Sequence, residues 1–559
     1  MKRNCRTGAN RRGSALVLTL VVVAMLTLGA AAFFERMFAE HQAERAYGRQ
    51  LQANNMAESG VEYCKALMME DPETITQSGG LYGNANLFQG VLVNDDSMAS
   101  SRGRFTVVAP DLTTEGYYGS MRYGLENESA RLNLNTILFA DKTEEGASRK
   151  LLMALPGMTE SIADAILDWI DSDNDSRQLG AERDYYASLS HPYAPRNGPL
   201  GSIEELLLVR DVTPALLFGA DLNRNGAIDG NEQNLVQIDN VDNSQGELNR
   251  GWAAYLTLDS AEANLRPDGK PKIDVNMDNL EELHKRLSEV LSADEANFIV
   301  AYRQGGPYTE KDSGKQISSV KVDLKQRGNV RLTTILDLIG VKTRIAKSSG
   351  GSSQSGQGQS GQNSGNTQNG LGSTQGTKSA TGGGSGSGGG NNSRVVIAPA
   401  FPNERGSMQT YLPKLMANVA VNSQPSIPGR LNINQAPRAL LAGIPNLPPA
   451  ALEQIIANRD VTMGQQKPDQ IYETWLLQDG IVELAEMKKL MSLVTSGGNV
   501  YRAQVVGFFD ENGPADRLEV VIDATQPTAP VVRRKWSLRS MGTGYTPEFL
   551  GVPVSDDAN

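Results

Sequence analysis

The stretch that decides the fold is Ser14-Ala-Leu-Val-Leu-Thr-Leu-Val-Val-Val-Ala-Met-Leu-Thr-Leu-Gly-Ala-Ala-Ala-Phe-Phe34, which carries no charge over its 21 residues. As a helix it would span about 30 Å, the hydrocarbon thickness of a bilayer. A basic leader precedes it, and its positive residues are Lys2, Arg3, Arg6, Arg11 and Arg12. Positive charge on one flank of a span favours the cytoplasmic side. We therefore expect one membrane span, with the amino terminus in the cytoplasm and the bulk of the chain across the membrane.

Three interpretations of this segment are open. A cleaved secretory signal could end at Ala30-Ala31-Ala32, although its apolar core would exceed the usual length of about 7–15 residues. An uncleaved signal anchor fits the same hydropathy. In the third interpretation, Gly13 followed at once by the apolar run from Ser14 resembles the cleavage site of prepilin-like proteins. That resemblance implies that a prepilin peptidase removes residues 1–13 and leaves the apolar helix, residues 14–34, on the mature protein.

The sequence departs from the prepilin-like pattern at Leu18. Proteins of this kind usually carry Glu at the fifth mature position, where it is thought to neutralise the amino terminus of the next subunit. A buried carboxylate without a partner is costly. A subunit with no neighbour above it would gain nothing from Glu, so Leu18 favours a place at a filament tip.

The rest of the chain predicts an α+β fold. Helical character continues through residues 35–70 and ends at Asp71-Pro72. Strand-like alternation occurs within residues 71–130 and again at 499–543, and mainly helical sequence lies between these blocks. The economical arrangement is a pilin-like body, in which a long amino-terminal helix packs on one small antiparallel sheet and a large helical domain is inserted into that sheet. Two separate β domains are the alternative.

We assign residues 131–347 and 394–498 to the two parts of this helical insert. Residues 348–393 consist almost wholly of Ser, Gly, Gln, Asn and Thr. Such a composition cannot bury a core and is typical of a flexible linker. Residues 544–559 form a short tail.

Charge and cysteine content narrow the class of protein. The net charge is −11, and loss of the leader would remove five positive charges and no acidic side chain. A chain this acidic is a poor partner for a polyanion. The two cysteines are Cys5 in the leader and Cys64. The mature chain would keep only Cys64 and could form no internal disulfide.

Three segments of the insert open alike, with Arg131-Leu-Asn-Leu-Asn, Lys272-Ile-Asp-Val-Asn and Arg430-Leu-Asn-Ile-Asn. The first continues to Leu155-Pro-Gly-Met and the third to Ile444-Pro-Asn-Leu-Pro-Pro, and both look like helix-hairpin-helix motifs. Such hairpins cradle phosphate when their amides are exposed and Lys or Arg lies nearby. Here acidic residues follow the first hairpin, and the third lacks a Gly-rich turn. We expect a helical docking fold and no nucleic-acid partner.

Residues 221–232 fit the twelve-residue calcium loop of EF-hand proteins. The oxygen donors expected at positions 1, 3, 5, 7, 9 and 12 are Asp221, Asn223, Asn225, Ala227 (through its carbonyl), Asp229 and Glu232. Gly226 at position 6 permits the sharp turn. Hard oxygen ligands of this kind suit Ca²⁺. A solvated acidic loop is the alternative.

A second acidic loop has weaker calcium spacing. Asp171, Asp173, Asp175 and Glu182 stand at positions 1, 3, 5 and 12, but the sixth position is not Gly. Carboxylates this close repel one another unless a cation joins them, while a solvated turn remains the alternative. Bound Ca²⁺ would stabilise the insert in place of disulfides.

Catalytic motifs are missing from the sequence. The three histidines, His41, His191 and His284, have no Cys or His partner at metal-ligand spacing. There is neither a nucleophile elbow nor a phosphate-binding P-loop. We expect no enzymatic activity.

With these residues in view, the chain resembles a minor pseudopilin of the K class from a type II (general) secretion pathway. The motifs that carry the resemblance are the leader, Arg131-Leu-Asn-Leu-Asn, the segment from Asp168-Trp-Ile-Asp to Tyr186, and Pro199 to Pro214. It implies a pilin-like α/β body with a large helical insert, calcium bound near the acidic loop, and a complex with other minor pseudopilins.

The resemblance implies a structural protein that caps or initiates the periplasmic pseudopilus of a diderm bacterium, anchored in the inner membrane, for protein export across the outer membrane. Exported proteins are further candidate partners. The linker, the extra EF-hand-like loop and the length depart from the family pattern and leave the exact partners open. The alternatives are a minor type IV pilin and a membrane-anchored helix-hairpin-helix receptor for DNA uptake.

Overall fold

The structure is a computed structural model that describes residues 12–238, 241, 243, 246–308, 316–317, 321–346, 394–462, 467–511 and 513–552. The chain divides into two compact units. The first contains the chain up to Leu265 and again from Gln424, and the second contains Arg266–Ser423. The predicted linker lies outside the described residues, as does the predicted leader apart from Arg12 and Gly13.

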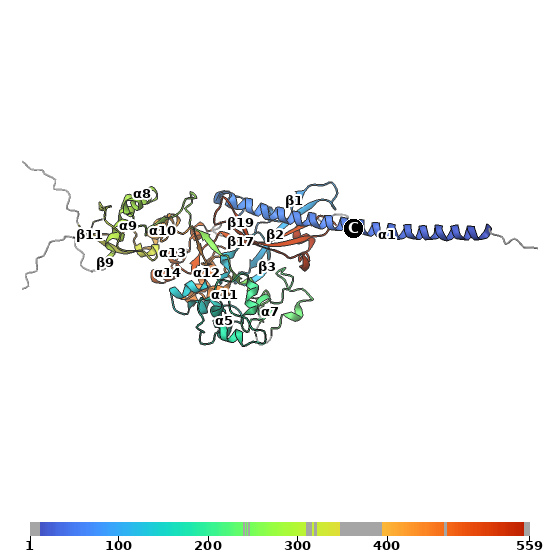
Figure 1. Cartoon of the computed structure of the whole chain (residues 1–559). Helices are drawn as coiled ribbons and strands as arrows, with labels where there is room; N and C mark the ends of the chain where they lie inside the picture. Colours follow the sequence, from blue (N-terminus) through green and yellow to red (C-terminus); the bar gives the residue numbers. More distant parts are fainter. Residues whose placement is uncertain are drawn as a thin grey trace, which may run out of the picture. The chain divides into compact units, whose positions relative to one another are not determined.

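The first unit begins with helix α1, Arg12–Met69, which is unbroken over 58 residues. It joins the segments predicted as a membrane helix, 14–34, and as a spine, 35–70. Its first half exposes large apolar side chains such as Met25 and Leu28, and Figure 1 shows this half extending away from the sheet. In the part of the chain that the structure describes, α1 is the one helix long and apolar enough to cross a membrane.

The second half of α1 buries one face. The buried side chains follow helical spacing and are Ala53, Met56, Ala57, Val61, Cys64 and Met68. From Ala57 onward they pack on side chains of the sheet, chiefly Phe105, Val107, Val505, Leu518, Val520 and Ile522. Full burial of each large apolar side chain contributes about 1.5–3 kcal/mol. This contact is therefore the core of the body.

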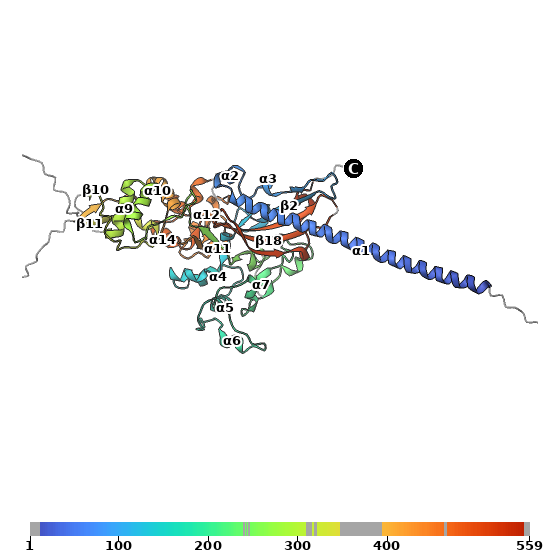
Figure 2. The same ribbon diagram turned by 45° about the horizontal axis from the view of Figure 1, so that its top comes forward.

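The sheet contains seven strands in the order β1-β2-β17-β18-β19, with β3 paired to β2 and β4 paired to β17. Their bounds are β1 Val91–Asn94, β2 Gly103–Leu112, β3 Tyr118–Tyr123, β4 Glu126–Asn127, β17 Val500–Phe509, β18 Asp516–Asp523 and β19 Val531–Ser537. Every pair is antiparallel, and in the central pair Val107 lies opposite Val505. Figure 2 shows α1 running across β2 and β18. The prediction of one antiparallel sheet built from both blocks is confirmed, and the alternative of two β domains is wrong.

The insert leaves and re-enters this sheet at one place. Asn127, at the end of β4, lies opposite Tyr501, near the start of β17. Beside it, Arg502 forms ion pairs with Glu128 at 2.5 Å and with Glu519 at 2.7 Å. Both carboxylates are buried, so loss of Arg502 would leave uncompensated charges. Because its two ends are neighbours, the insert does not interrupt the sheet.

The predicted tail, 544–559, contains a helix that packs on the sheet. Helix α15, Pro547–Leu550, places Leu550 in a small core with Phe508. The carbonyl oxygen of Leu550 accepts a hydrogen bond of 2.7 Å from the Thr106 hydroxyl. The apolar Phe549-Leu550 pair explains why this segment is ordered against the body.

The three repeated openings form equivalent short strands, which are β5 (Leu132–Asn133), β8 (Ile273–Asp274) and β15 (Leu431–Asn432). Each pairs in parallel with a later strand, and these partners are β6 (Leu256–Thr257), β13 (Val419–Ala420) and β16 (Val494–Thr495). Each repeat is thus a module closed by its own two-stranded ribbon. The first and third modules belong to the first unit, and the second module belongs to the second unit.

The repeated Asn and Asp residues hold each module together. The Asn or Asp that ends each opening strand accepts a hydrogen bond from the amide two positions on, at 3.0, 2.8 and 2.9 Å in the three modules. The Asn at that second position donates its side-chain amide to a carbonyl far along the chain. These pairs are Asn135 with Leu200, Asn276 with Leu332 and Asn434 with Gln470. The side chains of the repeated Asn and Asp residues therefore connect the opening strand of each module to segments far along the same module.

Each module also contains a helical pair, which confirms the predicted helical insert with hairpin repeats. The pairs are α4 Ala147–Met153 with α5 Glu160–Ile170, α8 Leu280–Val290 with α9 Ala293–Gly305, and α11 Arg438–Ala442 with α12 Pro449–Asn458. The second unit adds a small sheet in the order β10-β12-β11-β9, formed by Gln316–Ile317, Arg394–Ile397, Lys342–Ala346 and Pro307–Tyr308. The predicted insert, 131–347 and 394–498, is therefore divided between the two units.

The remaining helices are short apart from α10. They are α2 Pro72–Gln77, α3 Ala85–Phe88, α6 Arg183–Ala187, α7 Pro214–Phe218, α10 Arg405–Asn418, α13 Trp475–Gln478 and α14 Leu484–Leu490. Strands β7, Ala261–Ala263, and β14, Ser426–Pro428, pair antiparallel.

The backbone of helix α1 lies close to the sheet at Gly507. A Cβ at this position would lie 2.2 Å from the carbonyl oxygen of Ala53 and 2.5 Å from the amide nitrogen of Ala57. Both atoms belong to the α1 backbone, so Gly507→Ala should separate the helix from β17. We expect a loss of about 1–3 kcal/mol in the free energy of unfolding, measured by urea denaturation of the purified protein.

Gly48→Ala is the matched control, because Gly48 lies in α1 with no atom within 4 Å of an added Cβ. It should be neutral or stabilise by up to about 1 kcal/mol through helix propensity. Equal losses from the two substitutions would contradict the close helix–sheet contact.

Candidate metal centre

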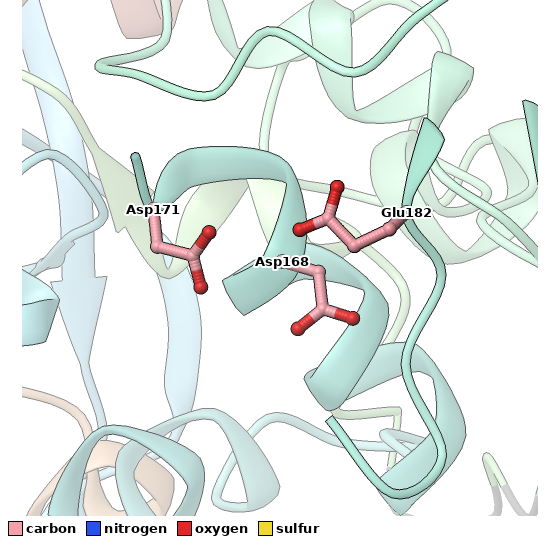
Figure 3. Close-up of side chains that lie close together, drawn as sticks. All are labelled: Asp168, Asp171 and Glu182. Carbon is pink, nitrogen blue, oxygen red and sulfur yellow. The ribbon is translucent and has the colours of Figure 1, made fainter. Parts of the chain in front are cut away.

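Three carboxylates come together at the end of α5. Asp168 lies in the last turn of that helix, Asp171 follows it, and Glu182 precedes α6. One oxygen from each lies within 4.8 Å of the others. Figure 3 shows Asp171 and Glu182 directed toward each other, with the carboxylate of Asp168 beside them. The helix end and the returning loop thus form one acidic cluster, which we call the Asp168 cluster.

Gly180 allows the loop to return this closely. A Cβ at Gly180 would lie 1.8 Å from a carboxylate oxygen of Asp168, so no other residue fits here without displacing Asp168. The neighbouring amide of Leu179 donates a 3.1 Å hydrogen bond to Asp164, one turn earlier on α5. These contacts hold residues 179–182 against the helix and bring Glu182 to the cluster.

Within the described ranges, Arg177 is the cationic side chain that forms ion pairs with the cluster. Arg177 donates through Nη1 to Asp168 at 2.7 Å and to Asp171 at 2.5 Å. The second oxygen of Asp171 and both oxygens of Glu182 are buried and have no hydrogen-bond partner among the described residues. Buried polar atoms are normally paired, so these three oxygens point to a missing partner.

Electrostatics agree with that conclusion. Burial, and then the nearby charges of Asp168 and Asp171, raise the pKa of Glu182 to about 7. Burial also raises the pKa of Asp171 above its usual value. A cation would relieve both effects, because it lowers the cost of holding several carboxylates close together. The donor set consists of hard oxygens, which fits Ca²⁺.

The structure brings together only part of the predicted second loop. Asp171 and Glu182 join the cluster, whereas Asp173 and Asp175 are exposed, and Asp173 accepts the amide of Asp175 at 2.9 Å. Sequence reasoning did not assign Asp168 as a ligand. Its spacing of three from Asp171 on one helix face was the available signal.

The EF-hand-like loop has the turn that its sequence predicts. Gly226 has a φ of 79°, in the left-handed region. Asp221 accepts the amides of Asn225 at 3.1 Å and Gly226 at 2.8 Å. Glu232 accepts the amides of Leu222 at 3.0 Å and Asp229 at 2.9 Å. The first and last ligand positions of the loop therefore both turn toward its interior.

Side-chain amides take part in the same network. Asn223 and Asn225 both donate their NH₂ groups to one oxygen of Asp229, at 2.6 and 3.2 Å. The oxygen of Asn225 accepts the amide of Ala227 at 2.8 Å. In this arrangement the two side-chain NH₂ groups, which carry partial positive charge, contact the carboxylate that a cation would contact. All six predicted ligand residues are thus near one another, and their carboxylates are better satisfied than those of the Asp168 cluster.

The EF-hand-like loop rests on the sheet of the body. Arg517 of β18 donates to the carbonyl of Asn223 and is fully buried. Burial lowers the pKa of Arg517 and raises that of Asp221. The loop therefore joins the insert to the sheet within the first unit.

Other segments of the first unit contact both of its helical hairpins. In the first hairpin, the indole of Trp252 donates to the carbonyl of Pro156 at 2.8 Å, and Val241 covers Gly157. In the third, Asn446 donates to Glu144 at 2.6 Å. Lys150 forms an ion pair with the same Glu144 at 2.6 Å, so charges of both signs lie beside this hairpin. This geometry agrees with a docking fold.

The third hairpin contains a left-handed turn residue, Asn446, that was not predicted from the sequence. Asn446 has a φ of 63°, close to the 69° of Gly157 in the first hairpin. Asn tolerates the left-handed region better than most residues, so Ile444-Pro-Asn is equivalent to Leu155-Pro-Gly.

Comparison with known proteins identifies the segment that contains the Asp168 cluster. Residues 130–218 match the family model described as "Type II secretion system (T2SS), protein K". This segment includes Asp168, Asp171 and Glu182 and ends before the EF-hand-like loop.

One curated relative is the type II secretion system protein K of Pectobacterium carotovorum subsp. carotovorum. It is 28% identical over 203 residues, which cover 35% of this chain and 57% of that protein. The chain thus spans little more than half the length of this relative.

A match among solved structures is the crystal structure of the GspK-GspI-GspJ complex from the enterotoxigenic Escherichia coli type 2 secretion system. It has 13% identity, covers 90% of this chain and 99% of that chain, and has a TM-score of 0.32, which is too low for a structural conclusion. The family and curated matches confirm the resemblance inferred from the motifs: the chain is similar to type II secretion system protein K, and residues 130–218 carry the sequence pattern of that family.

Proposed function

We propose that the protein is a minor pseudopilin that caps or initiates the periplasmic pseudopilus of a type II secretion system. The observation that carries this proposal is a pilin-like body, a long apolar helix packed on one antiparallel sheet, whose insert contains the protein K segment. The role is structural, and other minor pseudopilins are the proposed partners.

The proposed topology rests on α1. Its first half is apolar and exposed, and the basic leader favours a cytoplasmic amino terminus. The helix would cross the inner membrane and place the sheet and insert in the periplasm. Leu18 is 68% exposed on this helix, where filament subunits usually carry Glu, and this supports a place at the tip. Exported proteins would then be met at the same end of the filament.

Processing by a prepilin peptidase follows from this proposal. Gly13 and Ser14 lie within the helix α1, at the start of the apolar run. Amino-terminal sequencing of protein extracted from native membranes should give a mature start at Ser14. Gly13→Val should leave the leader attached, because a branched side chain at the cleaved bond blocks the peptidase.

The other outcomes identify different proteins. A start at Phe33 indicates a secretory signal cleaved by signal peptidase, and a start at Met1 indicates an uncleaved anchor. Either result overturns the pseudopilin proposal. The DNA-receptor alternative is disfavoured by the net charge of −11, because an acidic chain is a poor partner for a polyanion.

We further propose that Ca²⁺ is the cofactor. Asp168, Asp171 and Glu182 would hold an ion at the Asp168 cluster, where three oxygens have no hydrogen-bond partner in the part of the chain that the structure describes. The EF-hand-like loop, from Asp221 to Glu232, would hold a second ion. The bound metal would cross-link the insert, since a mature chain with Cys64 as its one cysteine could form no internal disulfide.

Calcium should raise the melting temperature of the chelator-treated protein by several degrees. At a free concentration 100 times the Kd, one site contributes about 2.7 kcal/mol. Glu182→Gln should remove the increment due to the Asp168 cluster, and Asp221→Ala the increment due to the EF-hand-like loop. The measurement is differential scanning calorimetry with and without Ca²⁺.

Asp173→Ala serves as the control, because Asp173 is an exposed acidic residue of the same segment outside the cluster. It should leave the calcium increment unchanged. If Ca²⁺ produces no shift in the unmodified protein, the cofactor proposal is wrong, whereas the proposal about processing stands on its own test.

A further inference from the structure

We propose that Arg177 is a built-in counter-ion that occupies the Asp168 cluster in the metal-free protein and competes with the metal ion for Asp168 and Asp171. Arg177 would then set the affinity of the site. This inference rests on the proposal that the cluster binds Ca²⁺, and it concerns a residue that no motif assigned to the site.

The contacts of Arg177 place its charge where a ligand cation would lie. A single nitrogen, Nη1, bridges Asp168 and Asp171 at 2.7 and 2.5 Å. Asp168 is fully buried, and the side chain of Asp171 is 13% exposed. Charge-assisted hydrogen bonds of this length are strong. A metal ion needs the same oxygens, so ion and guanidinium cannot both keep their full set of contacts.

Arg177 satisfies the cluster incompletely. Glu182 is 4% exposed, it points into the cluster, and neither of its oxygens has a partner among the described residues. The second oxygen of Asp171 is in the same state. Arg177 therefore supplies one positive charge to a cluster of three carboxylates. It contacts Asp168 and Asp171 and does not contact Glu182. A divalent ion with six to eight oxygen ligands suits this set better than a guanidinium.

The position of Arg177 in the loop suits a displaceable group. Its backbone amide donates to both oxygens of Asp168 at 3.3 Å, so the loop remains attached when the side chain leaves. The side chain is 29% exposed and can move into solvent without crossing the core. Arg177 thus keeps the loop folded without metal and opposes binding of the metal.

The test measures calcium binding by isothermal titration calorimetry on the full-length protein in detergent, together with the melting temperature in chelator. Arg177→Gln should bind Ca²⁺ more tightly, on the order of tenfold, a change of about 1.4 kcal/mol. The same variant should melt at a lower temperature without metal, because the carboxylates lose their counter-ion. Glu182→Gln identifies the heat that belongs to the Asp168 cluster.

Arg183→Gln is the matched control. Arg183 adjoins Glu182 and is exposed, so this variant removes the same charge without removing the contacts of Arg177. It should change the affinity little. Arg177→Lys should retain part of the competition, since it keeps the charge but loses the planar fork.

Equal or weaker calcium binding by a folded Arg177→Gln would overturn the inference and assign Arg177 the role of positioning Asp168 and Asp171. If neither binds Ca²⁺, both this inference and the cofactor proposal fail. If only the unmodified protein binds, this inference alone fails.

Discussion

The pairing of β2 with β17 is the constraint on which the rest of the structure depends. It joins segments that are far apart in the sequence. Beside this pair of strands, Arg104 donates a 2.6 Å hydrogen bond to Asp510, a residue 406 positions later in the chain. Only the completed sheet covers the apolar face of α1, because that face meets strands from both ends. The cost of closing so long a loop grows slowly with its length. A sheet of this kind can therefore accept a very large insert.

The insert meets this constraint because it is built from modules that close on themselves. Each opening strand pairs with its own closing strand, and the Asn clamps fix the chain between them. The first module also contains two acidic loops, the Asp168 cluster and the EF-hand-like loop. Each loop lies in a part of the chain that has little regular structure, and a cation bound to either would add a link between segments. At the Asp168 cluster these segments already touch through hydrogen bonds and through the rings of Trp169 and Tyr186. At the Asp168 cluster, Arg177 already takes part of this role.

The sequence predicted the long helix, the single sheet and the hairpin modules, because each depends on a periodic or repeated pattern. It predicted the turn of the EF-hand-like loop because all its candidate ligands lie within twelve residues. The other site was predicted only in part. Its geometry depends on a loop that returns to α5 at Gly180. A rule based on spacing along the sequence cannot predict this contact between the loop and the helix. That rule selects Asp173 and Asp175, which are exposed in the structure, and it does not select Asp168, which lies beside Asp171 and Glu182. The equivalence of Asn446 and Gly157 was not predicted either, because the two residues share a left-handed backbone conformation and not a residue type.

The most direct test of the central claim is a disulfide across β2 and β17. With Cys5 and Cys64 replaced by Ser, Val107→Cys and Val505→Cys stand opposite each other, at a Cβ separation of about 4.5–5.5 Å for such a pair. Mild oxidation of the folded protein should link them within one chain, as shown by gel mobility and by mass spectrometry of the joined peptides. Val107→Cys with Val520→Cys, on the next strand but one, should not link. Failure of the first pair to link, or equal linking of both pairs, would contradict a sheet built from the two ends of the chain.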